Sequence, residues 1–200
     1  MATIAGFLAQ KRPLSPTIRF GLLAAALVAL SCFVVWRRPW TSGERERELQ
    51  AKGGFELLVY ARKQQHVTLL DRFNRVVHPG EEIRFILAGV PEGHAYVLVA
   101  SVDAAGRATV YFPYQGTGSA PLPGPGRWEV PGSIVLDETL GPERVFAIFS
   151  ERPLAADDVV PALVQLGRAG KNAIRDARTL DVPGTEQRSF LMFKQARPGP

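Results

Sequence analysis

The stretch that decides the fold is residues 94–113, HAYVLVASVDAAGRATVYFP. Two runs rich in branched and aromatic side chains, residues 94–102 and 107–113, flank the tetrapeptide Asp103-Ala104-Ala105-Gly106. An Asp at the first turn position accepts hydrogen bonds from the backbone that follows it, and a Gly at the fourth tolerates a positive φ. This pattern predicts a β-hairpin whose arms are central strands with at least one buried face.

The same period of two recurs on both sides of this hairpin. It predicts strands at residues 55–62, 67–70, 83–88, 128–130, 133–136, 143–150 and 188–194. A helix is expected to begin with Asp157 or Asp158 as its cap and Pro161 in its first turn, and a shorter one spans residues 172–178. About eight strands with turns at short intervals predict an all-β, sandwich-like fold with one or two short C-terminal helices.

One long segment, residues 114–127, has no periodicity and contains four glycines and three prolines. Connections of this length in a compact domain are usually functional or disordered, and both interpretations stay open. The aromatic and apolar side chains in and beside it form our candidate surface for binding a partner: Tyr111, Tyr114, Leu122 and Trp128. Deleting residues 116–126 is expected to leave folding intact and to abolish binding.

Before these strands lies an uncharged run of seventeen residues at 20–36, FGLLAAALVALSCFVVW. At 1.5 Å per residue, a helix of this length nearly crosses a bilayer core of about 30 Å. The bulky residues at its end and Arg37-Arg38 argue against signal-peptide cleavage, and the residues before Cys32 make an imperfect lipid-attachment box. We therefore expect an uncleaved transmembrane helix, with a lipoprotein and a cleaved signal peptide as alternatives.

The orientation of this anchor is read from its flanks. The arm at residues 1–19 contains no acidic residue and resembles the cytoplasmic end of a signal anchor. The larger number of Lys and Arg residues after the helix points the other way under the positive-inside rule. We expect the C-terminal domain to be extracytoplasmic, which in a bacterium means attached to the inner membrane and facing the periplasm.

Charge separates the chain into two parts. Residues 1–52 contain eight Lys or Arg and three Glu, whereas residues 53–200 contain sixteen basic and sixteen acidic residues. The basic excess therefore belongs to the membrane flanks, and a nucleic-acid partner is not expected, because such binding needs excess positive charge on the folded domain. The expected organisation is an arm at 1–19, the anchor at 20–36, a linker at 37–54, the β domain at 55–194 and a disordered tail at 195–200.

Three motifs carry a family resemblance: Pro79-Gly80-Glu81, the hairpin at residues 96–113, and the segment 137–150, DETLGPERVFAIFS. With the preceding anchor, they resemble a bacterial membrane-anchored all-β domain family of unknown function. The resemblance covers most of residues 55–165. Domains of that family often follow a transmembrane helix, an anti-sigma-factor-like finger or a protein kinase. Residues 1–19 contain no Cys/His finger, so sigma-factor binding is not implied for this chain.

Motifs of known enzymes are missing from the sequence, which contains no P-loop, no G-x-S-x-G and no H-E-x-x-H. His66, His78 and His94 are too scattered to predict a metal site, and no cofactor is expected. The favoured function is a non-catalytic binding or sensor module of the cell envelope that recognises a protein, peptide or glycan. A hydrolase that uses acidic pairs such as Glu81-Glu82, and a structural envelope component, are the alternatives.

Overall fold

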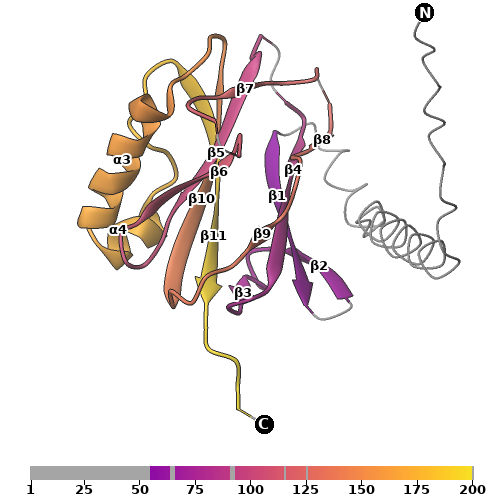
Figure 1. The fold of residues 1–200 in the computed structure, drawn as a ribbon, viewed down its shortest axis with the longest axis vertical. Helices are drawn as coiled ribbons and strands as arrows, with labels where there is room; N and C mark the ends of the chain where they lie inside the picture. The colour runs from indigo at the N-terminus through magenta and orange to yellow at the C-terminus, as the bar shows by residue number, and fades with distance from the viewer. Residues whose placement is uncertain (1–54, 64–65, 91–92, 115, 125, 200) are drawn as a thin grey trace, which may run out of the picture. The chain divides into compact units, whose positions relative to one another are not determined.

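A computed structural model describes residues 55–63, 66–90, 93–114, 116–124 and 126–199. This part of the chain is mostly β, with two sheets packed face to face and two helices outside one of them (Figure 1). The expected arm, anchor and linker at residues 1–54 lie outside the described residues. Neither helix of the described part has the length and apolar character that a membrane crossing requires.

The first sheet, sheet A, is built on two long antiparallel strands, β1 and β4. The strand β2 pairs with the outer edge of β1, while two short strands, β8 and β9, pair with β4. The members of sheet A are β1 (Glu56–Lys63), β2 (His66–Leu70), β4 (Glu82–Ala88), β8 (Trp128–Glu129) and β9 (Ile134–Val135).

The second sheet, sheet B, has the order β3-β11-β10-β5-β6, with β7 paired to β5. Its members are β3 (Val76–Val77), β5 (Tyr96–Val102), β6 (Ala108–Phe112), β7 (Ala120–Pro121), β10 (Gly141–Ser150) and β11 (Thr185–Lys194). The centre of sheet B is β10, which pairs antiparallel with β5 on one side and along its whole length with β11 on the other. Sheet B therefore joins strands that are far apart in the sequence.

The sandwich-like all-β prediction is confirmed, although the described residues form eleven strands where about eight were expected. The segments that the prediction lacked, β3 and β7, have only two residues each. Such short strands have no periodicity to detect, because pairing with β11 and β5 is what defines them.

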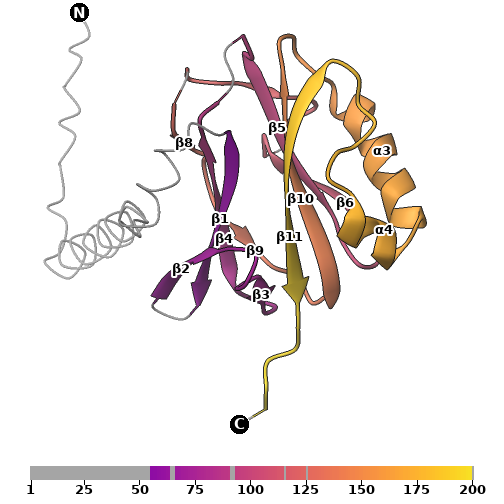
Figure 2. The same cartoon turned by 180° about the vertical axis from the view of Figure 1, so that it is seen from behind.

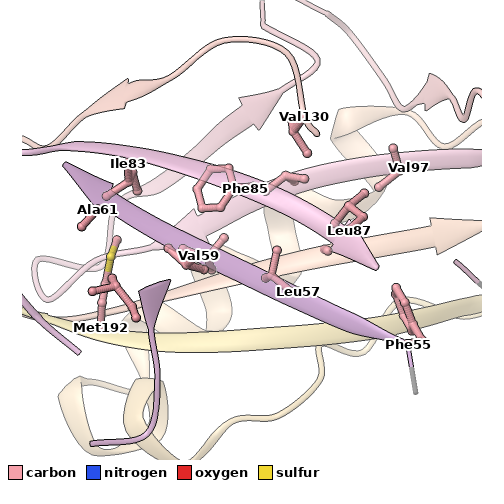
Figure 3. Packing of buried hydrophobic residues seen from close by; sticks show 14 of the residues in the cluster. Phe55, Leu57, Val59, Ala61, Ile83, Phe85, Leu87, Val97, Val130 and Met192 are labelled. Atoms are coloured by element: carbon pink, nitrogen blue, oxygen red, sulfur yellow. The ribbon is translucent and has the colours of Figure 1, made fainter. Parts of the chain in front are cut away.

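A continuous apolar core fills the space between the sheets. Figure 3 shows alternate residues of β1 and β4 pointing into it, together with Val97, Val130 and Met192. From β10, the residues Val145, Ala147 and Phe149 face this core. Alternation along every strand accounts for the arrangement, because successive side chains point to opposite faces of a sheet.

The helices α3 (Ala156–Arg168) and α4 (Lys171–Asp176) cover the outer face of sheet B, as Figure 2 shows from behind. A second apolar core lies between these helices and the sheet. Phe146 and Ile148 of β10 point into it and meet Val159 and Leu163 of α3. The strand β10 is thus buried on both faces, which explains its unbroken apolar run.

The start of α3 differs from the prediction. Its N-cap is Ala155, not Asp157 or Asp158. The carboxylate of Asp158, three residues further on, accepts a hydrogen bond of 3.0 Å from the backbone N–H of Ala155. The acidic residue therefore stabilises the helix start from inside the first turn, where it also complements the helix dipole.

The short helix α4 is held by a buried arginine. Arg144 of β10 is fully buried, and its guanidinium donates to the carbonyl oxygens of Ile174, at 2.7 Å, and of Arg175. A third hydrogen bond, of 3.2 Å, goes to the hydroxyl of Ser189 on β11. Carbonyls in the last turn of a helix have no intrahelical partner and carry partial negative charge, so Arg144 stabilises the C-terminal end of α4. Burial, together with the positive charges of Arg178 and Arg75, lowers the pKa of Arg144 to about 10.

Candidate functional site

The four residues of the predicted binding surface occupy different environments. Tyr111 on β6 stacks on Phe85 with 5.7 Å between ring centroids, and its hydroxyl donates to Glu143. Trp128 packs edge-on against Phe112 at 5.3 Å, and Leu122 packs against the core between the sheets. Only Tyr114 is largely free of such contacts, with 78% of its surface exposed. Three of these four side chains thus contribute to the core of the sandwich.

The long segment that follows Tyr114 is built into sheet B. Ala120 and Pro121 form β7 beside the start of β5, and Gly118 makes an isolated bridge to Ala155. The backbone N–H of Ser119 donates to the carbonyl of Leu154 at 2.8 Å, and the Ser119 hydroxyl accepts from the Leu154 N–H at 2.8 Å. These contacts argue against the expectation that residues 116–126 are dispensable for folding.

Leu154 also lines an open depression of about 710 Å³ at the end of sheet B where β10 stops and β11 starts. Three segments form its wall: His94, residues 150–154 and residues 183–186. Glu151 and Arg152 are exposed there, and Glu186 pairs with Arg188 at 3.3 Å. The depression combines charges of both signs with proline and leucine surface, which suits a peptide-like or polar ligand.

The opposite end of sheet B contains a cluster of charged side chains. Lys194, at the last position of β11, has a side chain that is only 2% exposed. Its ammonium contacts Asp137 Oδ1 and lies 2.8 Å from Glu143 Oε2. Glu143 Oε2 is buried and makes no well-angled hydrogen bond with the described residues, so the lysine is its close contact there. Tyr111 holds the other carboxylate oxygen, Oε1.

Arg107 extends this cluster to the turn of the β5–β6 hairpin. Its guanidinium pairs with Asp137 at 2.9 Å and with Asp103 at 3.1 Å. As predicted, Asp103 also organises the turn, because its Oδ1 accepts from the N–H groups of Ala105 and Arg107, both at 2.9 Å. The ionic cluster, which we define as Asp103, Arg107, Asp137, Glu143 and Lys194, thus joins the hairpin turn to β10 and β11.

Mutual attraction dominates the electrostatics of the ionic cluster. Burial alone would lower the pKa of Lys194, but the neighbouring Glu143 and Asp137 raise it overall. Partial burial acts to raise the pKa of Asp137, yet the hydrogen bonds from Lys194 and Thr139 and the positive charges of Lys194 and Arg107 lower it. Burial, followed by the negative charge of Glu143, raises the pKa of Tyr111 far above its usual value.

The acidic residues of the candidate hydrolase are mostly engaged in structural contacts. Glu81 is buried and accepts from the His78 N–H at 3.1 Å, while Glu82 pairs with Arg62 at 2.9 Å. The described residues contain no group of three or more His, Cys, Asp or Glu arranged to hold a metal ion. The ionic cluster itself was missed by sequence reasoning, because Lys194 and Asp137 are separated by 57 positions and meet only through strand pairing.

Comparison of the chain with protein-family models, curated proteins and solved structures found no match.

Proposed function

We propose that this chain is a membrane-anchored, extracytoplasmic binding or sensor module of the bacterial envelope that recognises a protein, peptide or glycan without catalysis. The observation that carries the proposal is the depression of about 710 Å³, and one residue of its wall, Leu154, is hydrogen-bonded to Ser119 of the segment that was singled out as a binding loop. A concave site with a few polar groups at the end of a rigid sheet is a common place for ligand recognition. The uncharged run at residues 20–36 supports the membrane attachment.

The non-catalytic part of the proposal rests on how the acidic side chains are used. Glu81, Glu82, Asp137 and Asp158 each accept a hydrogen bond or form an ion pair that stabilises a turn, a strand pair or a helix start. General acid–base chemistry needs such groups within reach of a substrate. In this domain they stabilise the fold, which favours a binding module over a hydrolase.

The binding proposal is tested by site-specific photo-crosslinking in the membranes of cells that make the protein. A photoreactive amino acid at Arg152, in the depression, or at Tyr114, in the loop, is expected to give a discrete crosslinked product. The matched control is Arg168, an exposed residue in the last turn of α3. Glycosidase and protease treatment of the product then distinguishes a glycan from a protein or peptide. Equal labelling from all three positions would reject the depression as the binding site.

The topology is tested separately with a reporter fused after Pro200. An enzyme that becomes active only outside the cytoplasm is expected to be active in this fusion, and a cytoplasm-only reporter to be inactive. The opposite result would place the domain inside the cell.

A further inference from the structure

The side chains of Lys194, Asp137 and Glu143 combine an amine, a carboxylate that it touches and a second, buried carboxylate. We propose that Lys194 and Asp137 condense to an intramolecular isopeptide bond, with Glu143 as the group that transfers the protons. The bond would be a self-made covalent modification of the domain, independent of the partner that the depression binds.

The strand register creates this arrangement. Lys194 is paired with Gly141 at the beginning of β10, and Glu143 lies two residues along β10 on the face toward the other sheet. Asp137 lies four residues before β10, and its Oδ1 contacts the lysine amine. Lys194 and Glu143 are held by the strand pair of β10 and β11, and Asp137 is held by hydrogen bonds from Arg107 and Thr139, so the reacting nitrogen and carboxyl carbon are kept close together. Such positioning replaces a bimolecular encounter and greatly raises the effective concentration.

The amine of Lys194 must lose a proton before it can attack the carboxyl carbon of Asp137. The resting state is the ion pair, in which the pKa of Lys194 is raised. The ionic cluster contains three carboxylates against two cations, so a proton that leaves Lys194 has an acceptor 2.8 Å away, at Glu143 Oε2.

The step balances without any other reactant. Lys194 gives a proton to Glu143, and the neutral amine attacks Cγ of Asp137. A second proton leaves the nitrogen, and Glu143 delivers the two protons to one carboxylate oxygen, which departs as water. The product is a secondary amide, and Glu143 returns to its starting form. Formally, one ammonium and one carboxylate give one amide and one water.

Hydrogen-bond donors surround the carboxylate that reacts. Arg107 Nη2 donates to Asp137 Oδ2 at 2.9 Å, and the Thr139 N–H donates to Oδ1 at 3.1 Å. Negative charge that develops on these oxygens during attack therefore faces fixed donors. Tyr111 donates to Glu143 Oε1 and orients the proton-transfer group, so it is a positioning residue.

The test is the intact mass of the full-length chain, purified in detergent. The wild-type protein is expected to be lighter than its sequence by one water, and proteolysis should release a branched peptide that joins residues 137 and 194. The variants Lys194→Arg and Asp137→Ala should have the masses of their sequences. A wild-type mass equal to that of the sequence would overturn the proposal, whether or not any variant folds.

The role of Glu143 is tested with Glu143→Gln, which keeps the shape of the side chain but cannot relay the protons. We expect its mass to be that of its sequence. If this variant does not accumulate as folded protein, Glu143→Asp is used, and bond formation is expected to slow by about tenfold or more. Cross-linking as complete and as fast as in the wild type, in whichever variant folds, would reject Glu143 as the proton-transfer group.

Discussion

The backbones of Gly106 and Gly167 are in direct contact: a Cβ atom on Gly167 would lie 2.6 Å from the carbonyl oxygen of Gly106. The contact joins the turn between β5 and β6 to the end of α3. Gly106 also has a φ of 78°, which the turn requires. Helix and sheet therefore approach each other here at the level of the main chain, with no side chain between them.

We expect Gly167→Ala to lower the free energy of unfolding by about 1–3 kcal/mol, because the added methyl group would force the turn and the helix apart. The measurement is urea denaturation of a fragment spanning residues 41–200, which contains the described β domain. Gln165→Ala is the control, since Gln165 is exposed on the same helix. A destabilisation no larger than that of the control would show that the two segments can separate freely.

Arg144→Met is expected to destabilise the domain by about 3 kcal/mol or more. The replacement fills similar space but leaves the buried carbonyl of Ile174 and the partly buried carbonyl of Arg175 without their donor. Hydrogen bonds from a charged donor contribute more to stability than neutral ones, and an unpaired buried acceptor is destabilising. Arg188→Met serves as a comparison at a partly exposed arginine that bonds to the carbonyl of Phe55. Hydrogen exchange should show faster opening of α4 in Arg144→Met only. Unchanged protection of α4 would mean that another contact holds the helix.

Phe146→Ala is expected to cost about 3–5 kcal/mol, because Phe146 is fully buried between sheet B and the helices. The matched control is Phe73→Ala, since Phe73 is 77% exposed. Thermal melting should separate the two variants clearly. Equal melting temperatures would contradict the placement of β10 at the centre of sheet B.

Removing residues 116–124 is expected to lower stability, contrary to the interpretation from sequence alone. The deletion takes away β7, the hydrogen bonds between Ser119 and Leu154, and the packing of Leu122 on the core. The point variant Tyr114→Ala, which removes only an exposed ring, should melt like the wild type. A deletion variant with the wild-type melting temperature would restore the view of a dispensable loop.

Local chemistry explains which parts of the fold the sequence predicted. Asp103 and Gly106 specify the hairpin turn through their own side chain and backbone, so the turn was found without any tertiary information. Apolar side chains of the predicted strands are buried as their pattern indicates, and five are fully buried: Val97, Val99, Phe146, Ile148 and Phe149. Val110 lies on the edge strand β6 and is only partly buried, against the core under the helices. Alternation and branched side chains were sufficient evidence for these strands.

The parts that were missed depend on contacts between distant residues. Lys194 is the last residue of the apolar strand β11, where a lysine is usually exposed to solvent. It is buried here because the pairing of β11 with β10 brings Glu143 beside it. Arg144, directly before the apolar run of β10, is buried for the same kind of reason, since its partners are carbonyls of a helix thirty residues away. Backbone acceptors leave no signal in side-chain patterns, so the sequence could not have indicated them.

Alkaline pH should reveal the burial of Tyr111. Burial and the neighbouring Glu143 raise the pKa of its phenol above the ordinary value of 10.0, so the folded state keeps a proton that the unfolded chain loses. Stability that depends on this proton is complete below a pH of about 10 and falls as the pH rises above it, because only the unfolded state ionises there. We expect Tyr111→Phe to lose stability less steeply over this range than the wild type, in urea denaturation at successive pH values. Tyr114→Phe is the control, since Tyr114 is exposed. Parallel pH profiles for the wild type and Tyr111→Phe would show that the Tyr111 phenol ionises as freely in the folded domain as in the unfolded chain.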